Sequence, residues 1–130
     1  MTRNAKGEFE VKLVPQTEDR DIPLLGRLTI DKVFHGDIVG SSQGQMLSAK
    51  TTVPASAGYV AIERVEATID GKQGSFVLQH NATMNKGEYM LNIIVVPDSG
   101  TDELTGIAGK LNIIIKEKKH FYELEYTLPE

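Results

Sequence analysis

The sequence contains no cysteine and no tryptophan, and only 6% of its residues are aromatic. The absence of cysteine excludes a disulfide framework, a thiol nucleophile and a thiolate metal site. The longest apolar run, residues 93–96, is far too short to span a membrane. Residues 1–20 contain no apolar stretch of the kind that marks a secretory signal. We therefore expect a cytoplasmic protein that has no membrane partner.

Positive charge is also scarce, because 18 acidic residues outnumber 14 basic ones and the net charge is −4. Such a chain is a poor match for nucleic acid, so we expect no nucleic-acid partner. The three histidines do not recur at the short spacing typical of metal ligands, and we expect neither a metal nor a cofactor. The length of 130 residues, 40% of them hydrophobic, predicts a single domain over residues 1–130 that builds its own core.

Alternation of apolar and polar residues predicts β-strands along most of the chain. Leu111, Ile113 and Ile115, for example, alternate with Asn112 and Lys116. No segment shows a sustained helical period, and the sole helical signal is one turn near residues 99–104. Eight strands are expected, near residues 8–13, 28–34, 37–48, 59–69, 76–84, 91–96, 111–116 and 121–128, joined mostly by hairpin-length turns.

Eight consecutive antiparallel strands leave two exposed edges unless the sheet closes on itself. We therefore predict an all-β fold, a single eight-stranded antiparallel up-and-down barrel, with a two-sheet sandwich as the alternative. A barrel of this size is either filled by side chains or holds one small ligand. Gly36, Gly40 and Gly44 recur at every fourth position, which puts them on one face of a strand, where we expect it to bend.

Two ionisable residues lie on apolar strand faces. Glu63 shares a face with Tyr59 and Val65, and His80 shares a face with Phe76. A hairpin that puts both apolar faces on one side also puts Glu63 and His80 on that side. An inward-facing charge is costly unless it is paired, so we expect the two side chains to interact.

The register of the hairpin decides how Glu63 and His80 meet. If Asp70 pairs with Gln73, the two residues face each other directly, and a register two residues away makes them diagonal neighbours. Two interpretations of the pair stay open. It either fixes the strand register as a satisfied structural contact, or acts as a catalytic acid–base dyad at the base of a cavity.

Other inward-facing side chains would surround a ligand if the barrel is hollow. The expected ligand-binding residues are Tyr59, Phe76, Leu78, Leu111, Ile113, Tyr122 and Tyr126. The tyrosines among them also fit a second role, as core aromatics whose hydroxyl groups are satisfied by neighbours. Lys32 lies between Ile30 and Phe34 on an apolar face, where we expect it to reach toward the rim, with a Schiff-base lysine as the alternative.

Two further segments match patterns associated with ligand sites. Residues 40–44 satisfy the G-x-S-x-G pattern, but no helix follows, so a bent β-strand is expected rather than a nucleophile elbow. The polar loop at residues 97–102 follows the most apolar strand and is expected to end that strand with a capped turn. A lid or an anion-binding nest at the barrel mouth is the alternative for this loop.

Several segments together carry a family resemblance. The patterns are Tyr-x-x-x-Glu-Arg at 59–64, Gly-Ser-Phe-x-x-x-His at 74–80 and Ser-Gly-Thr at 99–101, with further matches at 26–37, 96–104 and 122–129. They resemble a family of small bacterial proteins of unknown function, whose members are similar to the barrel of plant allene oxide cyclase. The resemblance implies an eight-stranded barrel and no established activity. No catalytic role carries over from the plant enzyme, because its residues do not correspond position by position.

Three functions from different classes fit these observations. The first is a barrel that binds a small apolar or amphipathic molecule, with Glu63 and His80 as its polar anchor. The second is an isomerase or cyclase in which this dyad moves a proton inside an apolar pocket. The third is a solid-cored scaffold without a ligand, and an open pocket of about 300 Å³ or more would argue against it. We also expect a homo-oligomer, because the strand at residues 91–96 is apolar on both faces.

Overall fold

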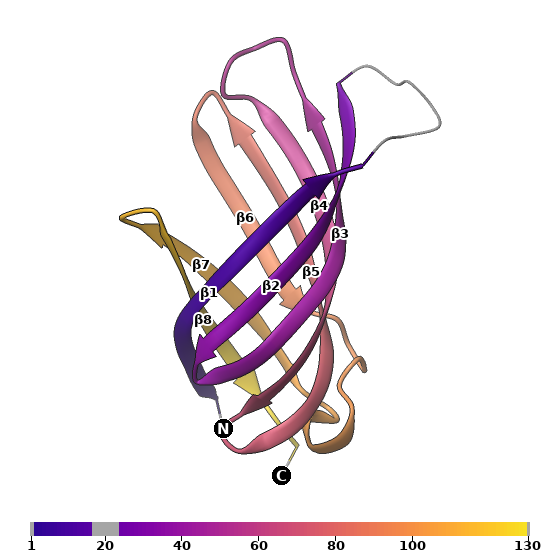
Figure 1. Cartoon of the computed structure of the whole chain (residues 1–130), viewed down its shortest axis with the longest axis vertical. Coiled ribbons are helices and arrows are strands. Elements are labelled where there is room, and N and C mark those ends of the chain that lie inside the picture. Colours follow the sequence, from indigo (N-terminus) through magenta and orange to yellow (C-terminus); the bar gives the residue numbers. More distant parts are fainter. Residues whose placement is uncertain (1, 17–23, 130) are drawn as a thin grey trace.

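The computed structural model describes residues 2–16 and 24–129, which form one closed antiparallel β-barrel (Figure 1). Each strand pairs with its neighbours in sequence, and the last strand pairs back to the first. The strands are β1 (Arg3–Pro15), β2 (Leu25–Gly36), β3 (Ile38–Lys50), β4 (Ala57–Ile69), β5 (Lys72–Asn85), β6 (Glu88–Val95), β7 (Ala108–Lys116) and β8 (Lys119–Thr127). The predicted eight-stranded up-and-down barrel is confirmed, and the sandwich alternative is wrong. No helix in the described residues is long and apolar enough to cross a membrane.

Two-residue turns close three of the hairpins, at residues 70–71, 86–87 and 117–118. Both residues of each turn have positive φ, between 49° and 94°. This conformation belongs to the turn type whose twist matches that of the flanking strands. Gly71 and Gly87 adopt it without a steric cost, whereas the third turn imposes it on Glu117 and Lys118.

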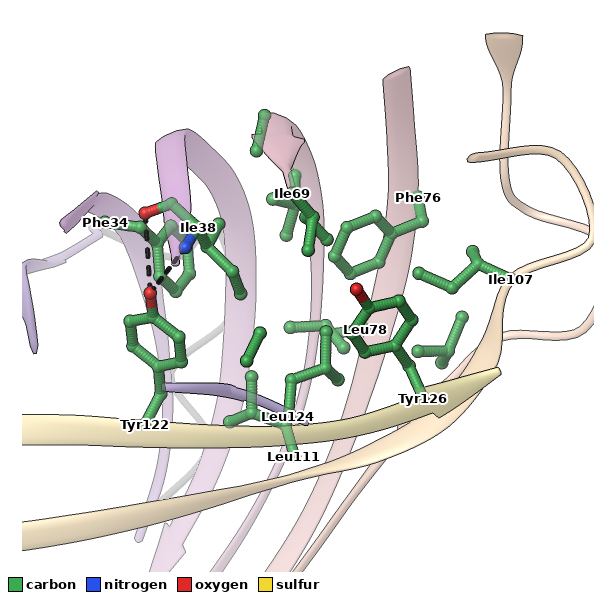
Figure 2. Packing of buried hydrophobic residues seen from close by; sticks show 14 of the residues in the cluster. Phe34, Ile38, Ile69, Phe76, Leu78, Ile107, Leu111, Tyr122, Leu124 and Tyr126 are labelled. Atoms are coloured by element: carbon green, nitrogen blue, oxygen red, sulfur yellow. Dashed lines mark hydrogen bonds between the residues drawn. The ribbon is translucent and has the colours of Figure 1, made fainter. Parts of the chain in front are cut away.

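One half of the barrel interior, nearest the chain ends, is filled by side chains. Figure 2 shows aromatic and aliphatic residues from several strands interlocking there, and ten are labelled: Phe34, Ile38, Ile69, Phe76, Leu78, Ile107, Leu111, Tyr122, Leu124 and Tyr126. All ten are at most 4% exposed. This half is therefore a packed core that supplies most of the burial of apolar surface.

Two tyrosines of β8 fasten this core to distant turns. The Tyr122 hydroxyl donates to the His35 carbonyl and accepts from the Ile38 backbone N–H, both at 2.8 Å (Figure 2 shows the Ile38 contact). The Tyr126 hydroxyl donates to Asp70 Oδ2 at 2.7 Å. Each ring fills the core while its hydroxyl group bonds to a turn: Tyr122 reaches across β1 to the β2–β3 turn, and Tyr126 reaches across the barrel to the β4–β5 turn.

A longer connection between β6 and β7 packs against β5. It contains the short 3₁₀ helix η1 (Asp102–Leu104), where a single turn was predicted. The Thr101 side chain does not cap this helix, because its hydroxyl oxygen instead accepts from the Ser75 backbone N–H at 3.0 Å. The connection also buries Leu104 and Ile107 in the core, so it closes this end of the barrel.

The seam between β6 and β7 is the least complete in the barrel. Among the described residues these strands pair only at Ile94 and Lys110. Beyond this point the two strands diverge toward their hairpin turns, as Figure 1 shows. All the other neighbouring strands pair over at least seven consecutive positions.

Candidate functional site

The other half of the barrel, away from the chain ends, opens into a pocket of about 580 Å³. Apolar side chains from β1, β2, β3, β5, β6 and β7 make up most of its wall. The polar residues of the lining are Lys32, Tyr59, His80, Tyr89 and His120. The pocket is within the range of volumes that protein ligand sites have, about 300 to 1,000 Å³.

A buried ionic cluster lies at the inner end of this pocket, with Glu63 at its centre. Glu63 Oε2 accepts a hydrogen bond from Lys32 Nζ at 2.8 Å and lies 2.6 Å from His80 Nε2. Glu63 Oε1 accepts from the Ser42 hydroxyl at 2.8 Å. The exposed fractions of these residues are 0% for Glu63, 7% for Lys32, 4% for His80 and 2% for Ser42. The cluster is therefore removed from bulk water, where ionic contacts are strong.

Four neighbouring strands, β2 to β5, each contribute one residue of the cluster. The β4–β5 turn pairs Ile69 with Lys72, so Glu63 lies opposite Leu78 and His80 lies opposite Ala61. Glu63 and His80 are thus diagonal neighbours, and the direct register is wrong. The reason is the position of the two-residue turn, which consists of Asp70 and Gly71, so Asp70 does not pair with Gln73.

Gly44 makes the reach from β2 to β4 possible. A Cβ atom on Gly44 would lie only 2.6 Å from the Glu63 Cα and 2.1 Å from the Ile62 carbonyl oxygen. Without a side chain at this position, β3 and β4 approach closely, and Lys32 on β2 extends past β3 to Glu63. Gly44 thus lies at a close approach of two strands, where only a residue without a side chain fits.

Two opposing effects act on the pKa of Glu63. Burial, the largest single effect, raises it by disfavouring the charged form. The hydrogen bond from His80, the charge of Lys32 and their further contributions lower it more, so the pKa falls from 4.5 to about 2. Glu63 is therefore ionised at neutral pH, and its oxygen accepts the proton carried by His80 Nε2. In this tautomer the other ring nitrogen of His80, Nδ1, carries no proton, and the imidazole lines the pocket.

The predicted site residues fall into two groups in the structure. Tyr59, Ile113 and His80 line the pocket, and Glu63 lies directly behind His80. The other five belong to the packed half and do not line the pocket, contrary to the prediction: Phe76, Leu78, Leu111, Tyr122 and Tyr126. They face inward as predicted, but alternation along a strand does not show at which depth of a barrel a residue lies.

Lys32 and Ser42 are the cluster members whose role the sequence analysis missed. The structure buries the Lys32 ammonium beside Glu63 rather than at the rim. Held as an ion pair, this ammonium has no lone pair for Schiff-base formation. The sequence already places Lys32 on an inward face of its strand. Because the inward carboxylate of Glu63 needs an opposite charge, the two residues could have been paired from the sequence. Ser42 has the inward parity of Gly40 and Gly44, which was the available signal for it.

A larger hollow, of about 680 Å³, lies on the outside of the barrel beside η1. Exposed polar side chains such as Arg64, Glu66 and Glu103 line it. Arg64 is already paired with Glu66 and with the Ser75 hydroxyl. Because ligand sites are concave and mostly apolar, the interior pocket is the better candidate. No group of three or more potential metal-ligating residues occurs in the described parts of the chain.

Comparison with known proteins places the chain in a family. Residues 5–126 match the model of a family described as protein of unknown function, DUF3224. The chain belongs to the DUF3224 family. A crystal structure of a DUF3224 protein of unknown function from Shewanella oneidensis MR-1 is similar to it, with 44% sequence identity and a TM-score of 0.94. The similarity covers 100% of this chain and 99% of that chain. None of the curated proteins matches the chain.

The predicted resemblance to a bacterial family of unknown function is thus confirmed. The likeness of that family to the allene oxide cyclase barrel stays a prediction. Neither the family description nor the Shewanella protein's name states a ligand or a reaction.

Proposed function

We propose that this DUF3224 protein binds one small apolar or amphipathic molecule in the open half of its barrel. The observation that carries the proposal is the apolar pocket of about 580 Å³ with a buried ionic cluster at its inner end. A scaffold with no ligand accounts for the packed half of the interior and leaves the hollow half without a role. Buried ion pairs also tend to be no more stabilising than well-packed apolar residues. The cluster therefore favours recognition over stability alone.

The wall of the pocket supports the same proposal. Aliphatic and thioether side chains, among them Met46 and Met84, surround the space, and methionine adapts its shape to irregular apolar partners. At the mouth, the Tyr59 and Tyr89 hydroxyl groups lie 3.1 Å apart and provide the polar end of an otherwise apolar surface. A ligand with an apolar body would contact the wall, and its polar atoms would meet the cluster or the mouth.

Fluorescence titration with N-phenyl-1-naphthylamine, a neutral apolar probe, tests the proposal. We expect saturable binding with a blue-shifted emission. Ile113→Trp fills the pocket and should abolish binding, whereas Ile114→Trp, on the outward face of the same strand, should leave it unchanged. Failure of the wild-type protein to bind, or equal binding by both variants, would contradict the proposal.

A second candidate function is catalysis of isomerase or cyclase type, as the sequence suggested for the Glu63–His80 dyad. His80 supports it, because Glu63 holds Nε2 and leaves Nδ1 as the base. For a ketone ligand, the C–H bond next to the carbonyl would break, its proton would move to Nδ1, and its electron pair would move to the carbonyl oxygen beside Lys32. Glu63 does not line the pocket, so its part would be to orient His80.

Deuterium exchange into β-ionone, an unsaturated apolar ketone, tests this second function by NMR in D₂O. Catalysis predicts deuterium in the methyl group next to the carbonyl at a rate above the protein-free control. His80→Phe should remove this exchange while the naphthylamine probe still binds. Binding of the ketone without any exchange would reject the enzyme and leave the binding function in place.

We also propose that the protein forms a homo-oligomer and is located in the cytoplasm. The outward side of β6 includes Met90, which is 71% exposed, beside exposed Asn92 and half-buried Ile94. Met90 lines one hollow of the outer surface together with Leu47 and Val60 on β3 and β4, and these two residues and Ile62 are each more than half exposed. Leu47 and Val60 are direct partners across these strands. Light scattering at micromolar concentration tests for a second copy, and a monomer would contradict the proposal.

A further inference from the structure

We infer that the ligand carries a carboxyl group, which binds at the inner end of the pocket with one oxygen on Lys32 and the other on His80. This inference rests on the proposed binding function and specifies the chemical class of the ligand. It follows from which hydrogen-bonding groups of the cluster are used within the protein and which remain for a ligand.

Lys32 has donors to spare. An ammonium group carries three N–H donors, and in the described structure Lys32 makes one side-chain hydrogen bond, to Glu63. Its Nζ also lies 4.9 Å from the centre of the Phe9 ring, a contact that attracts the cation without using a hydrogen-bond acceptor. Lys32 lines the pocket, so an acceptor atom of a ligand can take a remaining N–H.

His80 offers a second polar atom of a different kind. Its Nε2 is engaged by Glu63, and Nδ1 has no hydrogen-bond partner within the described residues. A carboxyl group can form a hydrogen bond with Nδ1 whichever of the two partners holds the proton. The acid O–H can donate to Nδ1, or protonated Nδ1 can donate to the carboxylate. An alcohol has a single oxygen atom, so it can satisfy only one of the two groups fully. An ester has no O–H proton to donate to Nδ1.

The charges around the pocket favour the same ligand. Neither aspartate nor glutamate is among the pocket-lining residues, although the whole chain has a net charge of −4. Glu63 lies behind Lys32 and His80 and has both oxygens engaged, so the cluster presents its nitrogen atoms to the pocket. The other polar residues of the lining, the two tyrosines and His120, carry no negative charge at neutral pH.

Three probes that share one tail test the inference by titration calorimetry: decanoic acid, 1-decanol and methyl decanoate. We expect the acid to bind at least about tenfold more tightly than the ester, since hydrogen bonds to charged groups contribute that much or more. The alcohol should lie between them. Equal affinities for the three probes would overturn the carboxyl assignment. If the naphthylamine probe still binds, the binding function itself stands, whereas no binding by any of the four probes contradicts both.

A double variant separates the cluster from general effects of charge. Lys32→Met with Glu63→Gln removes both charges together, which avoids leaving either one buried and unpaired. The matched control, Lys6→Met with Glu123→Gln, removes an exposed ion pair of 3.5 Å on the outside of the barrel. We expect the cluster variant to lose the preference for the acid and keep the naphthylamine site, and the control variant to keep both. An unchanged preference for the acid in the cluster variant would overturn the inference.

Discussion

Lys32 on β2 and Glu63 on β4 form a buried ion pair of 2.8 Å across the intervening strand β3. That strand assists the contact in two ways, because Ser42 donates to the second carboxylate oxygen and Gly44 leaves space beside Glu63. The ion pair therefore ties together three strands that backbone pairing joins only in neighbouring pairs. It also presents Lys32 to the pocket in one fixed position.

Breaking this pair from one side should be far more damaging than removing it whole. Glu63→Gln leaves the Lys32 charge buried without a counter-charge, and Lys32→Met does the same to Glu63, so we expect each to cost about 3 to 5 kcal/mol of stability. The double variant should lose clearly less than the sum of the two. Urea unfolding of the four proteins measures the coupling, and additive losses would show that the pair is not energetically coupled.

Stability should depend on pH through Glu63. A carboxyl group whose pKa is lowered from 4.5 to about 2 in the folded protein stabilises it above pH 4.5, by about 3 kcal/mol. This contribution is lost as the pH falls from 4.5 toward 2. The stability difference between wild type and Glu63→Gln should therefore shrink over this window in urea unfolding. The exposed control Glu117→Gln should show no such convergence, and a constant difference down to pH 2 would contradict the prediction.

Gly44→Ala should destabilise the barrel, because the new Cβ would lie 2.1 Å from the Ile62 carbonyl oxygen. Backbone atoms cannot move aside cheaply, so we expect a loss of about 2 kcal/mol or more. Gly58→Ala is the matched control, since its nearest neighbour would be 3.6 Å away. Its stability should stay within about 0.5 kcal/mol of wild type in thermal unfolding. Similar melting temperatures for the two variants would contradict the close approach of β3 and β4.

Hydrogen exchange should be fastest along the seam between β6 and β7. Residues 88–93 and 111–116 have no ladder partner across this seam, whereas β3 and β4 are paired along their full lengths. Unpaired amides exchange without local unfolding, so alternate residues of β6 and β7 should exchange early. Mass spectrometry with residue-level fragmentation measures this. Equal protection of the seam and of the β3–β4 pair would contradict it.

Alternation along the strands was sufficient to predict the barrel and the inward direction of Glu63, His80 and Lys32. The register of the β4–β5 hairpin was left between two values, because a two-residue turn can begin at more than one residue within Asp70–Gly74. The structure resolves this through the positive φ of Asp70 and Gly71. A local pattern could not decide it, since the two registers place the same residues on the same face.

The division of the interior into a packed and an open half was beyond the sequence pattern for a different reason. Tyr122 and Tyr126 fill the packed half because their hydroxyl groups reach turns that are distant in the chain. Leu104 and Ile107 enter it from a connection that is not a strand. Such packing depends on which segments meet in three dimensions, so residues of one inward face could not be assigned to core or pocket.

The pairing of β1 with β8 has a consequence for how the molecule is made on the ribosome. Until β8 has emerged, β1 has an unsatisfied edge, and the ring cannot close before all eight strands have been synthesised. Glu8, Glu10 and Lys12 occupy alternate positions along β1. Charged side chains on an unpaired strand discourage it from pairing with a strand of a neighbouring nascent chain. The first strand of the barrel thus carries side chains that protect its unpaired edge until β8 pairs with it.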